Sequence, residues 1–267
     1  MKKLDGVGLA QVQQVYGGAE GDLWELIMGQ QIHIGGFASS MALADRAGLQ
    51  PGLRGVDLCC CNGAGMRFLL QFRQAAFMTG VDATPKVLDQ GRDRCAAAGL
   101  DDRVRFVQAG VCLTGLPDGE ADFVWGEDAW CYVVDKAALI AEAVRLVRRG
   151  GTIAFTDWIE GPAGLSDAEA QRFMTFMKFP SIQDLEGYRQ LLRKARAEML
   201  VAEDTKQFAP HVDLYLNMVN MQLTSDALRL LGNDLNVLQA VGAEMLFMQQ
   251  LAHAGKIAQG RFVARKT

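Results

Sequence analysis

The sequence predicts an α/β fold in which helices cover both faces of a mostly parallel β-sheet. Three observations predict it. Short apolar runs alternate with helical patterns between residues 54 and 157, a glycine-containing turn follows the first apolar run, and no internal repeat or low-complexity linker interrupts the series. Strands and helices that alternate at this spacing form βαβ units, whose strands run parallel. The chain of 267 residues, half of them hydrophobic, is long enough to bury a sizeable core.

The expected strands and helices follow in order along this region. A first strand at 54–60 runs into the turn at 61–65, and the apolar spacing of 66–72 predicts a helix behind it. A second strand at 76–81 ends at Asp82, and Pro85 suits the first turn of a helix that extends to residue 97. The remaining expected elements are strands at 104–107, 121–125 and 152–157 and a helix at 136–148 that Gly150 and Gly151 stop.

Two helical regions flank this series. Residues 8–48 are rich in helix formers around an irregular patch at 29–36. Residues 164–250 read as long amphipathic helices, broken at 179–181 and 208–211, and a strand pattern returns at 258–266.

Composition and charge exclude several classes of function. The chain carries 27 Lys and Arg against 31 Asp and Glu, and no basic tract is present. Nucleic acids and anionic membranes are bound through basic patches, so neither is an expected partner. No apolar run reaches the length of a membrane span, and the first residues lack the apolar core of a secretory signal. We expect a cytoplasmic protein whose six cysteines are free thiols.

Polar residues gather where the expected parallel strands end. In sheets of this kind, ligands bind beyond the carboxyl ends of the strands. Those ends carry the turn at 57–65, Asp82, residues 109–110, residues 127–128 and Asp157. A glycine-containing turn between a strand and a helix can hold a ligand through backbone amides, and an acid that ends the next strand is a typical ribose ligand. The pair predicts a nucleoside-bearing ligand.

This series resembles the class I S-adenosylmethionine-dependent methyltransferases. The first motif of that family usually reads Asp-Leu-Gly-Cys-Gly-Thr-Gly, and residues 57–63 read Asp-Leu-Cys-Cys-Cys-Asn-Gly. Similar blocks continue at 80–82, 104–109, 116–124 and 146–153. The resemblance implies a Rossmann-like, seven-stranded, mostly parallel sheet.

It also implies a division of the chain into three parts. Residues 1–50 would form a helical N-terminal lid or substrate segment, and residues 51–160 the core that binds S-adenosylmethionine. Residues 161–267 would form a helical insertion on the substrate side together with C-terminal strands that complete the sheet.

Several segments narrow the resemblance. Residues 126–129, the Ile-His-Ile-Gly core of the 29–36 patch, Pro180-Ser181 and 188–192 are similar to sarcosine/dimethylglycine N-methyltransferases, and phosphoethanolamine, tocopherol and related enzymes share much of the pattern. The resemblance implies in-line methyl transfer to a small molecule, with S-adenosylhomocysteine as the product. The sequence offers no evident Asp-His base pair, which favours an amine nitrogen as the acceptor. O- or C-methylation of a small aromatic or lipid-like acceptor is the alternative, as is a binding protein that has lost transfer.

The family motifs imply site residues, carried over position by position. Cofactor-binding residues would be His33, Asp57, Cys59, Cys61, Gly63, Asp82, Ala83, Gly110, Val111 and Glu127. From the residues themselves we expect Asp128, Trp130, Trp158 and Tyr215 to bind the acceptor, with Trp130 facing the site because it follows Asp128 at a strand end. The alternative is that these aromatic side chains belong to the core. Catalytic positions would be Tyr16, Tyr132 and His211.

Three departures from the family pattern bear on this assignment. Cys59 and Cys61 replace motif glycines, and their Cβ atoms narrow the approach to the cofactor, although cysteine remains compact. Gly110 lies where many relatives have an acid for the adenine amino group. Tyr132 lies where phosphoethanolamine enzymes place a histidine beside an N-terminal tyrosine. The dyad would here be Tyr16 with Tyr132, which cannot be a base near neutrality at an ordinary tyrosine pKa of about 10.

Other interpretations stay open at this stage. Three consecutive cysteines could serve redox or metal chemistry, but structural zinc sites space their ligands by two to four residues, so no metal is expected. An acceptor with a carboxylate would need an arginine, and Arg67, Arg172 and Arg189 are available without a reason to choose among them. The sequence leaves a homodimer open.

Overall fold

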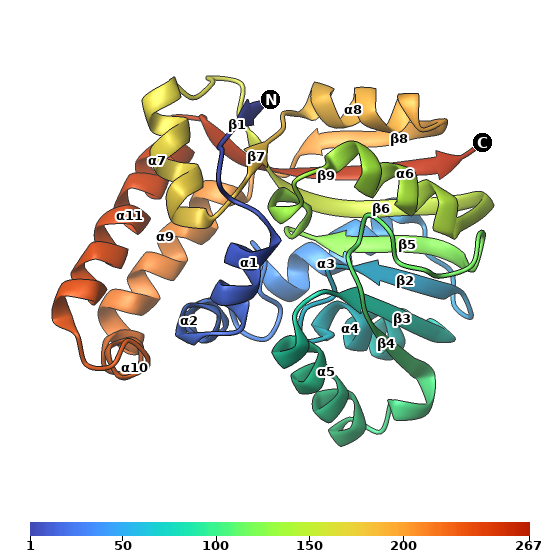
Figure 1. The fold of residues 1–267 in the computed structure, drawn as a ribbon, viewed down its shortest axis with the longest axis horizontal. Coiled ribbons are helices and arrows are strands. Elements are labelled where there is room, and N and C mark those ends of the chain that lie inside the picture. Colours follow the sequence, from blue (N-terminus) through green and yellow to red (C-terminus); the bar gives the residue numbers. More distant parts are fainter.

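A seven-stranded sheet forms the centre of the computed structural model, which describes residues 1–267 (Figure 1). The strand order is β4-β3-β2-β5-β6-β9-β8, and only β9 runs antiparallel to its neighbours. This is the mostly parallel, Rossmann-like sheet that was expected. The strands are β2 (Arg54–Leu58), β3 (Phe77–Asp82), β4 (Val104–Gln108), β5 (Ala121–Glu127), β6 (Val147–Glu160), β8 (Ala197–Asp204) and β9 (Ile257–Lys266).

Helices cover both faces of the sheet, and each face has its own hydrophobic core. Buried residues of α6 (Lys136–Leu146) and α8 (Leu185–Lys194) pack on one face. The other face packs against α3 (Gly36–Ala47), α4 (Ala64–Phe72) and α5 (Pro85–Ala97). Apolar side chains buried on both faces explain why the central strands read as nearly continuous hydrophobic runs.

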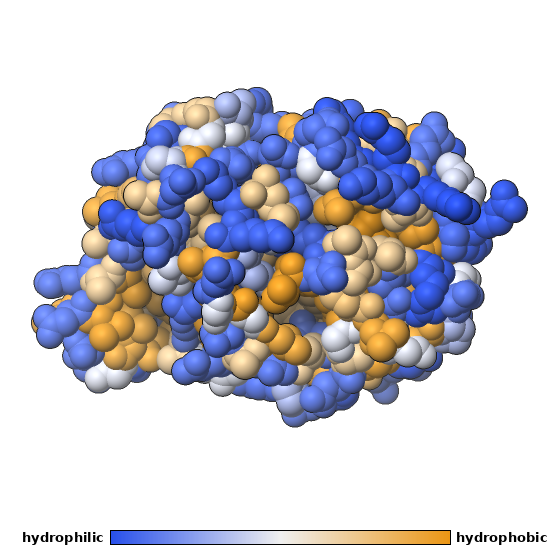
Figure 2. All heavy atoms as spheres, turned by 45° about the horizontal axis from the view of Figure 1, so that its top comes forward, coloured by the Kyte–Doolittle hydropathy of each residue, from blue (hydrophilic) through white to orange (hydrophobic).

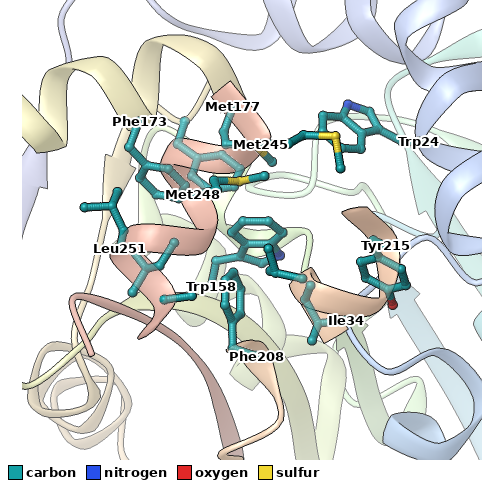
Figure 3. Packing of buried hydrophobic residues seen from close by; sticks show 14 of the residues in the cluster. Trp24, Ile34, Trp158, Phe173, Met177, Phe208, Tyr215, Met245, Met248 and Leu251 are labelled. Atoms are coloured by element: carbon teal, nitrogen blue, oxygen red, sulfur yellow. The ribbon is translucent and has the colours of Figure 1, made fainter. Parts of the chain in front are cut away.

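A layer of helices lies beside the sheet, next to the last residues of β6 and the first residues of β9 (Figure 1). Trp158 lies at the centre of its core, between Phe173 and Phe208, and Met245 and Met248 fill the space around these rings (Figure 3). Unbranched methionine side chains adapt to such gaps. The layer comprises α1 (Leu9–Tyr16), α2 (Ala19–Met28), α7 (Asp167–Met177), α9 (Phe208–Met218), α10 (Thr224–Leu230) and α11 (Leu235–His253), with a π-helical turn, η3 (Val219–Leu223).

Two expectations about element boundaries were wrong: the end of the helix at residue 148, and Gly150 and Gly151 as the residues that stop it. The helix that begins at Lys136 ends at Leu146, not at residue 148, because Val147 already pairs with Ala121 as the first residue of β6. Gly150 therefore lies within a strand.

None of the helices combines the length and the apolar composition that crossing a bilayer requires.

The expected helical stretch at 164–250 contains two strands. The short β7 (Ser181–Ile182) pairs with β1 (Lys2–Lys3), and β8 forms the edge of the main sheet. The β8 sequence, Ala-Glu-Met-Leu-Val-Ala-Glu-Asp, consists largely of helix formers. Pairing with β9 overrides that local preference, as tertiary context commonly does for strands.

Candidate active site

A cavity of about 370 Å³ opens at the carboxyl ends of β2, β3 and β5 and beside the turn that follows β4. Its remaining wall comes from α1 and from the 29–36 segment, which connects α2 to α3. Ligand pockets in proteins typically have volumes of about 300–1,000 Å³. The cavity therefore has the size of a small-molecule site and lies where the sequence predicts one.

The turn between β2 and α4 keeps the backbone of a glycine-rich loop. Cys59 and Cys61 have φ angles of 64° and 47°, and Gly63 has a φ angle of 71°. The left-handed region is natural for glycine but costs other residues roughly 1–2 kcal/mol each. The two cysteines thus adopt the conformation for which the family motif carries glycine, in spite of their Cβ atoms.

Hydrogen bonds to Asp82 and Arg67 hold this turn. The Cys61 amide donates to Asp82 Oδ2 at 3.1 Å, and the Thr84 amide donates to Asp82 Oδ1 at 2.8 Å. Arg67 Nη1 donates to the Asn62 carbonyl at 2.7 Å. Burial raises the pKa of Asp82, and the amide hydrogen bonds partly oppose this effect.

Gly65 makes room for two converging carboxylates. A Cβ atom at this position would lie 3.0 Å from Asp57 Oδ2 and 3.2 Å from Glu127 Oε2. Burial raises the pKa of Asp57 well above its usual range, and the negative charges of Glu127 and Asp82 raise it further. Such a pair of carboxylates beside an open cavity favours a positively charged ligand group.

Buried hydrogen bonds among Asp128, Gln259 and Ile34, here called the clamp, fix the 29–36 segment at the cavity wall. Asp128 is 5% exposed and accepts hydrogen bonds from the Ile34 amide at 2.9 Å and from Gln259 Nε2 at 2.8 Å. Gln259, near the start of β9, also donates to the Ile34 carbonyl at 3.1 Å. Burial raises the pKa of Asp128, against the effect of His33 and these hydrogen bonds. Three segments far apart in the sequence therefore meet at one carboxylate.

Ser40 connects His33 to Glu127, the last residue of β5, through hydrogen bonds. Ser40 Oγ lies 3.2 Å from His33 Nε2 and donates to Glu127 Oε1 at 2.7 Å. His33 Nε2 is itself 3.4 Å from that carboxylate oxygen. The contact places His33 at the cavity wall and connects it to Glu127.

The two tyrosines of the expected dyad do meet. Tyr16 Oη donates to Tyr132 Oη at 3.0 Å, and the rings pack edge to face with centroids 5.5 Å apart. Burial raises the pKa of both hydroxyl groups well above the usual range. Both side chains line the cavity as neutral phenols.

Five other predicted site residues do not line the cavity: Trp130, Trp158, His211, Tyr215 and Gly63. Trp130 is fully buried and stacks on Phe155 with ring centroids 4.0 Å apart, so it does not face the site. Its indole lies directly over Gly126, where a Cβ atom would be 2.3 Å from Nε1. Trp158 lies in the helical core shown in Figure 3, and His211 bonds the Gln207 carbonyl on α9.

Tyr215 does not line the cavity but hydrogen-bonds to the backbone of the 29–36 segment. Its hydroxyl accepts from the Gly35 amide at 3.2 Å and donates to the His33 carbonyl at 3.4 Å. Figure 3 shows this hydroxyl on the outer side of the helical core, near Ile34.

The remaining predicted residues lie as follows. Gly63 does not line the cavity, and its positive φ instead starts α4 beside the Phe106 ring. The predicted positions at the cavity wall are His33, Asp57, Cys59, Cys61, Asp82, Ala83, Gly110, Val111, Glu127 and Asp128. Lining residues without a sequence signal include Leu9, Val12, Cys112, Val133 and Val134, whereas Gln30, Gln31 and Ile32 belong to the 29–36 patch and were within reach of prediction. Asn62 and Gly65 were within reach of prediction because they belong to the turn.

The cysteines of the turn have no features of a thiolate or metal centre. Burial raises the pKa of the Cys59, Cys60 and Cys61 thiols, and the nearby Asp82 charge raises it further. Nucleophilic and metal-bound cysteines need the opposite shift. No group of three or more His, Cys, Asp or Glu side chains is arranged to hold a metal ion.

Comparisons with known proteins agree on one family. A methyltransferase domain family matches residues 56–155. The 27-O-demethylrifamycin SV methyltransferase of Amycolatopsis mediterranei is 31% identical over 202 residues, which cover 70% of this chain and 74% of that enzyme. Phosphoethanolamine N-methyltransferase 1 of Arabidopsis thaliana is 26% identical over 187 residues, which are 69% of this chain but 37% of the plant enzyme.

Solved structures show the same fold. Phosphoethanolamine N-methyltransferase 2 of Haemonchus contortus, in complex with phosphomonomethylethanolamine and S-adenosylhomocysteine, has a TM-score of 0.83 at 19% identity. The match covers 97% of this chain and 59% of that one. A candidate sarcosine dimethylglycine methyltransferase from Galdieria sulphuraria has a TM-score of 0.76 at 20% identity, covering 86% and 84%.

The cavity fits the cofactor of this family. S-adenosylmethionine carries a sulfonium, an ammonium and a carboxylate group. The acidic side chains at the wall suit the two cations, and with no lysine or arginine at the wall the backbone amides of the turn are the donors that remain for the carboxylate. The space that Gly65 leaves beside Asp57 and Glu127 would be filled by any larger residue. With the fold, the fit and the relatives in agreement, the chain belongs to the class I S-adenosylmethionine-dependent methyltransferases, enzymes that here act on a small molecule.

Proposed function

We propose that the protein transfers a methyl group to the nitrogen of a small-molecule amine. One observation carries the proposal: the side chains beside the apolar wall that could act as a base are already hydrogen-bonded within the protein, His33 with Ser40 and Asp135 with the Ala138 amide. Tyr16 and Tyr132 are neutral and bonded to each other, and Asp128 is engaged by Gln259 and the Ile34 amide. A hydroxyl acceptor needs a base to remove its proton, whereas a neutral amine already presents a lone pair.

The proposed cofactor contacts follow the cavity wall. Asp82 would bind the ribose hydroxyls, since each of its oxygens keeps acceptor capacity after the amide bonds of the turn. Ala83, Gly110 and Val111 would flank the adenine. Asp57, with the turn at 59–65, and Glu127, supported by His33, would hold the methionine end.

When bound, S-adenosylmethionine supplies an electrophilic methyl group on a sulfonium. The contribution of the chain is then mainly to position the acceptor and to exclude water. The Tyr16–Tyr132 pair spans the gap between α1 and the segment after β5, and Tyr132 Oη can donate to or accept from an acceptor group. Asp128 also lines the cavity, and its carboxyl group favours the positive charge that an amine gains on methylation.

O-methylation is a second candidate, which the most identical relative reported above favours. That enzyme is named for a 27-O-demethylated substrate and shares 31% of its residues with this chain, against 26% for the plant N-methyltransferase. O-methylation would require a base that removes the hydroxyl proton, and the candidate bases at the cavity wall are already hydrogen-bonded.

Two measurements on the full chain test the proposal. Calorimetric titration with S-adenosylmethionine and S-adenosylhomocysteine asks whether the cysteine-bearing turn still binds, and we expect micromolar affinity. Transfer of a labelled methyl group to 1-octylamine and to 1-octanol, which share one skeleton, then compares nitrogen with oxygen. We expect methylation of the amine, with a rate that rises with pH as the amine loses its proton. Tight binding without transfer to either class would support a protein that has lost catalysis, and transfer to the alcohol alone would support the second candidate.

A further inference from the structure

We infer that the acceptor is an apolar molecule without a phosphate or carboxylate, whose body extends through the mouth of the cavity between α1 and residues 133–135. The inference rests on the proposed methyl transfer and names the class of molecule that receives the group. It separates this chain from relatives named for phosphoethanolamine or for dimethylglycine, whose substrates carry a phosphate or a carboxylate group.

The first observation is the charge of the cavity wall. Five carboxylates line it, those of Asp57, Asp82, Glu127, Asp128 and Asp135, and no lysine or arginine does. Phosphates and carboxylates in proteins are held by arginine, lysine or several aligned amides. An anionic acceptor would enter a negative cavity without a counter-charge, and burial of an unpaired charge is strongly unfavourable.

The nearby cations are committed elsewhere. Arg67 bonds the Asn62 carbonyl and Gln30 Oε1, which fixes the turn. Lys136 is 4% exposed and bonds Ser181 Oγ at 2.9 Å and the Cys131 carbonyl at 3.2 Å. Arg172 pairs with Glu244 on the helical layer, and Arg189 bonds the Ala202 carbonyl at the edge of the sheet. The arginines considered from the sequence for a carboxylate therefore do not reach the cavity.

The second observation is the apolar mouth. Leu9 and Val134 line the cavity and are 52% and 61% exposed, so they lie where it opens to solvent. The two sides of the mouth lie close together, since a Cβ atom added to Gly8, just before α1, would lie 4.0 Å from Val134 Cγ2. Val12 and Val133 continue the apolar surface inward. Figure 2 shows hydrophobic atoms around a hollow near the middle of the face drawn there.

The third observation is the size of the cavity. At about 370 Å³ it is near the lower end of the range of about 300–1,000 Å³ for ligand pockets. A nucleoside-bearing cofactor takes up most of such a volume. The reacting nitrogen of the acceptor can reach the Tyr16–Tyr132 pair, but the rest of a larger molecule must lie against the mouth, where burial of apolar surface contributes about 25 cal/mol per Å².

Binding to the protein loaded with S-adenosylhomocysteine tests the inference without requiring turnover. The probes are 1-octylamine, 1-octanol, 8-aminooctanoate and phosphoethanolamine. We expect octylamine to bind at least tenfold more tightly than 8-aminooctanoate, which differs by a terminal carboxylate, and phosphoethanolamine to bind most weakly. Equal or tighter binding of either amine that carries an anionic group overturns the inference, as does the failure of every probe to bind at millimolar concentration.

A charge introduced at the mouth gives a second test. Val134→Arg places a cation on an exposed side chain, and it should improve the binding of 8-aminooctanoate relative to octylamine by about tenfold. Met221→Arg is the matched control, since Met221 is 80% exposed on the η3 turn of the helical layer and does not line the cavity. It should change that ratio by less than twofold. An unchanged ratio in Val134→Arg would place the acceptor body elsewhere.

Turnover separates the two claims. If octylamine binds with the expected preference and no methyl group is transferred, methyl transfer to amines fails while the acceptor class stands. If transfer occurs to anionic amines as readily as to apolar ones, the proposed function stands and the class fails.

Discussion

Restoring glycine at positions 59 and 61 should stabilise the protein and tighten cofactor binding. Both cysteines have φ angles in the left-handed region, 64° and 47°, and both residues line the cavity. Cys60, between them, has no positive φ and is 5% exposed, with its sulfur packed against Gly80. The three consecutive cysteines are therefore predicted to respond to the same substitution in opposite directions.

The magnitude follows from two opposing effects. A non-glycine residue in the left-handed conformation costs roughly 1–2 kcal/mol, which glycine removes. Glycine also adds freedom to the unfolded chain, worth about 0.4–1 kcal/mol in the other direction. Each of Cys59→Gly and Cys61→Gly should thus raise the free energy of unfolding by up to about 1.5 kcal/mol, and each kcal/mol shifts Tm upward by roughly 2–4 °C in a protein of this size.

Cofactor affinity should change for a separate reason. Removal of Cβ and Sγ from the wall lets the backbone of the turn approach the ligand more closely. We expect the Kd for S-adenosylhomocysteine to fall severalfold in each variant. Thermal unfolding followed by circular dichroism measures the first effect, and calorimetric titration measures the second.

Two control variants separate the effects. Gln74 has a φ angle of 55° in an exposed loop outside the cavity, so Gln74→Gly should give a similar gain in stability with no change in Kd. Cys60→Gly should lower stability because it empties a packed position. The reasoning is refuted if Cys59→Gly and Cys61→Gly lower Tm as Cys60→Gly does, or if Gln74→Gly changes the Kd as much as they do.

Three further variants test other parts of the site. Gly65→Ala puts a methyl group 3.0 and 3.2 Å from two carboxylate oxygens, so we expect calorimetry to show at least a tenfold loss of cofactor affinity with an unchanged circular dichroism spectrum. Gln259→Leu removes the donor to buried Asp128 and should cost about 1–3 kcal/mol in urea unfolding, with a near-neutral result arguing against the clamp. Burial raises the pKa of Asp157 to about 6, so the folded state binds this proton more tightly than the unfolded state. Relative to Asp157→Asn, wild-type stability should therefore fall by up to about 3 kcal/mol between pH 4 and pH 6, and urea unfolding that shows a rise across this window would contradict it.

The parts of the fold that local sequence determines were predicted well. Pro85 begins α5 at the first helical position, as expected from its fixed φ angle and missing amide. The strands at the centre of the sheet are buried on both faces and therefore appear as apolar runs. β8 lacked such a signal, because an edge strand with one neighbour is specified mainly by the partner, β9, and not by its own residues.

The site divides in the same way. Asp57 and Asp82 could be predicted because parallel strands bring their carboxyl ends to one edge. Trp130 was expected to face the cavity because it follows Asp128, but Asp128 has a φ angle of 50° and turns the chain back over the sheet. The space above Gly126 then accommodates the indole. A left-handed aspartate leaves no mark in hydrophobic periodicity, so the direction of the next side chains could not be read from the sequence.

The two halves of the cavity depend on different parts of the chain, which explains why close similarity of fold does not determine the acceptor. The cofactor half consists of strand ends and the turn, all within the matched region at 56–155. The mouth combines Val134 of that region with Leu9 and Val12 of α1, which lies outside it. A few substitutions on these exposed surfaces can change the charge of the mouth without disturbing the sheet. A TM-score of 0.83 to a phosphoethanolamine enzyme is thus compatible with a mouth that has no cation for phosphate, because function follows the site and not the fold.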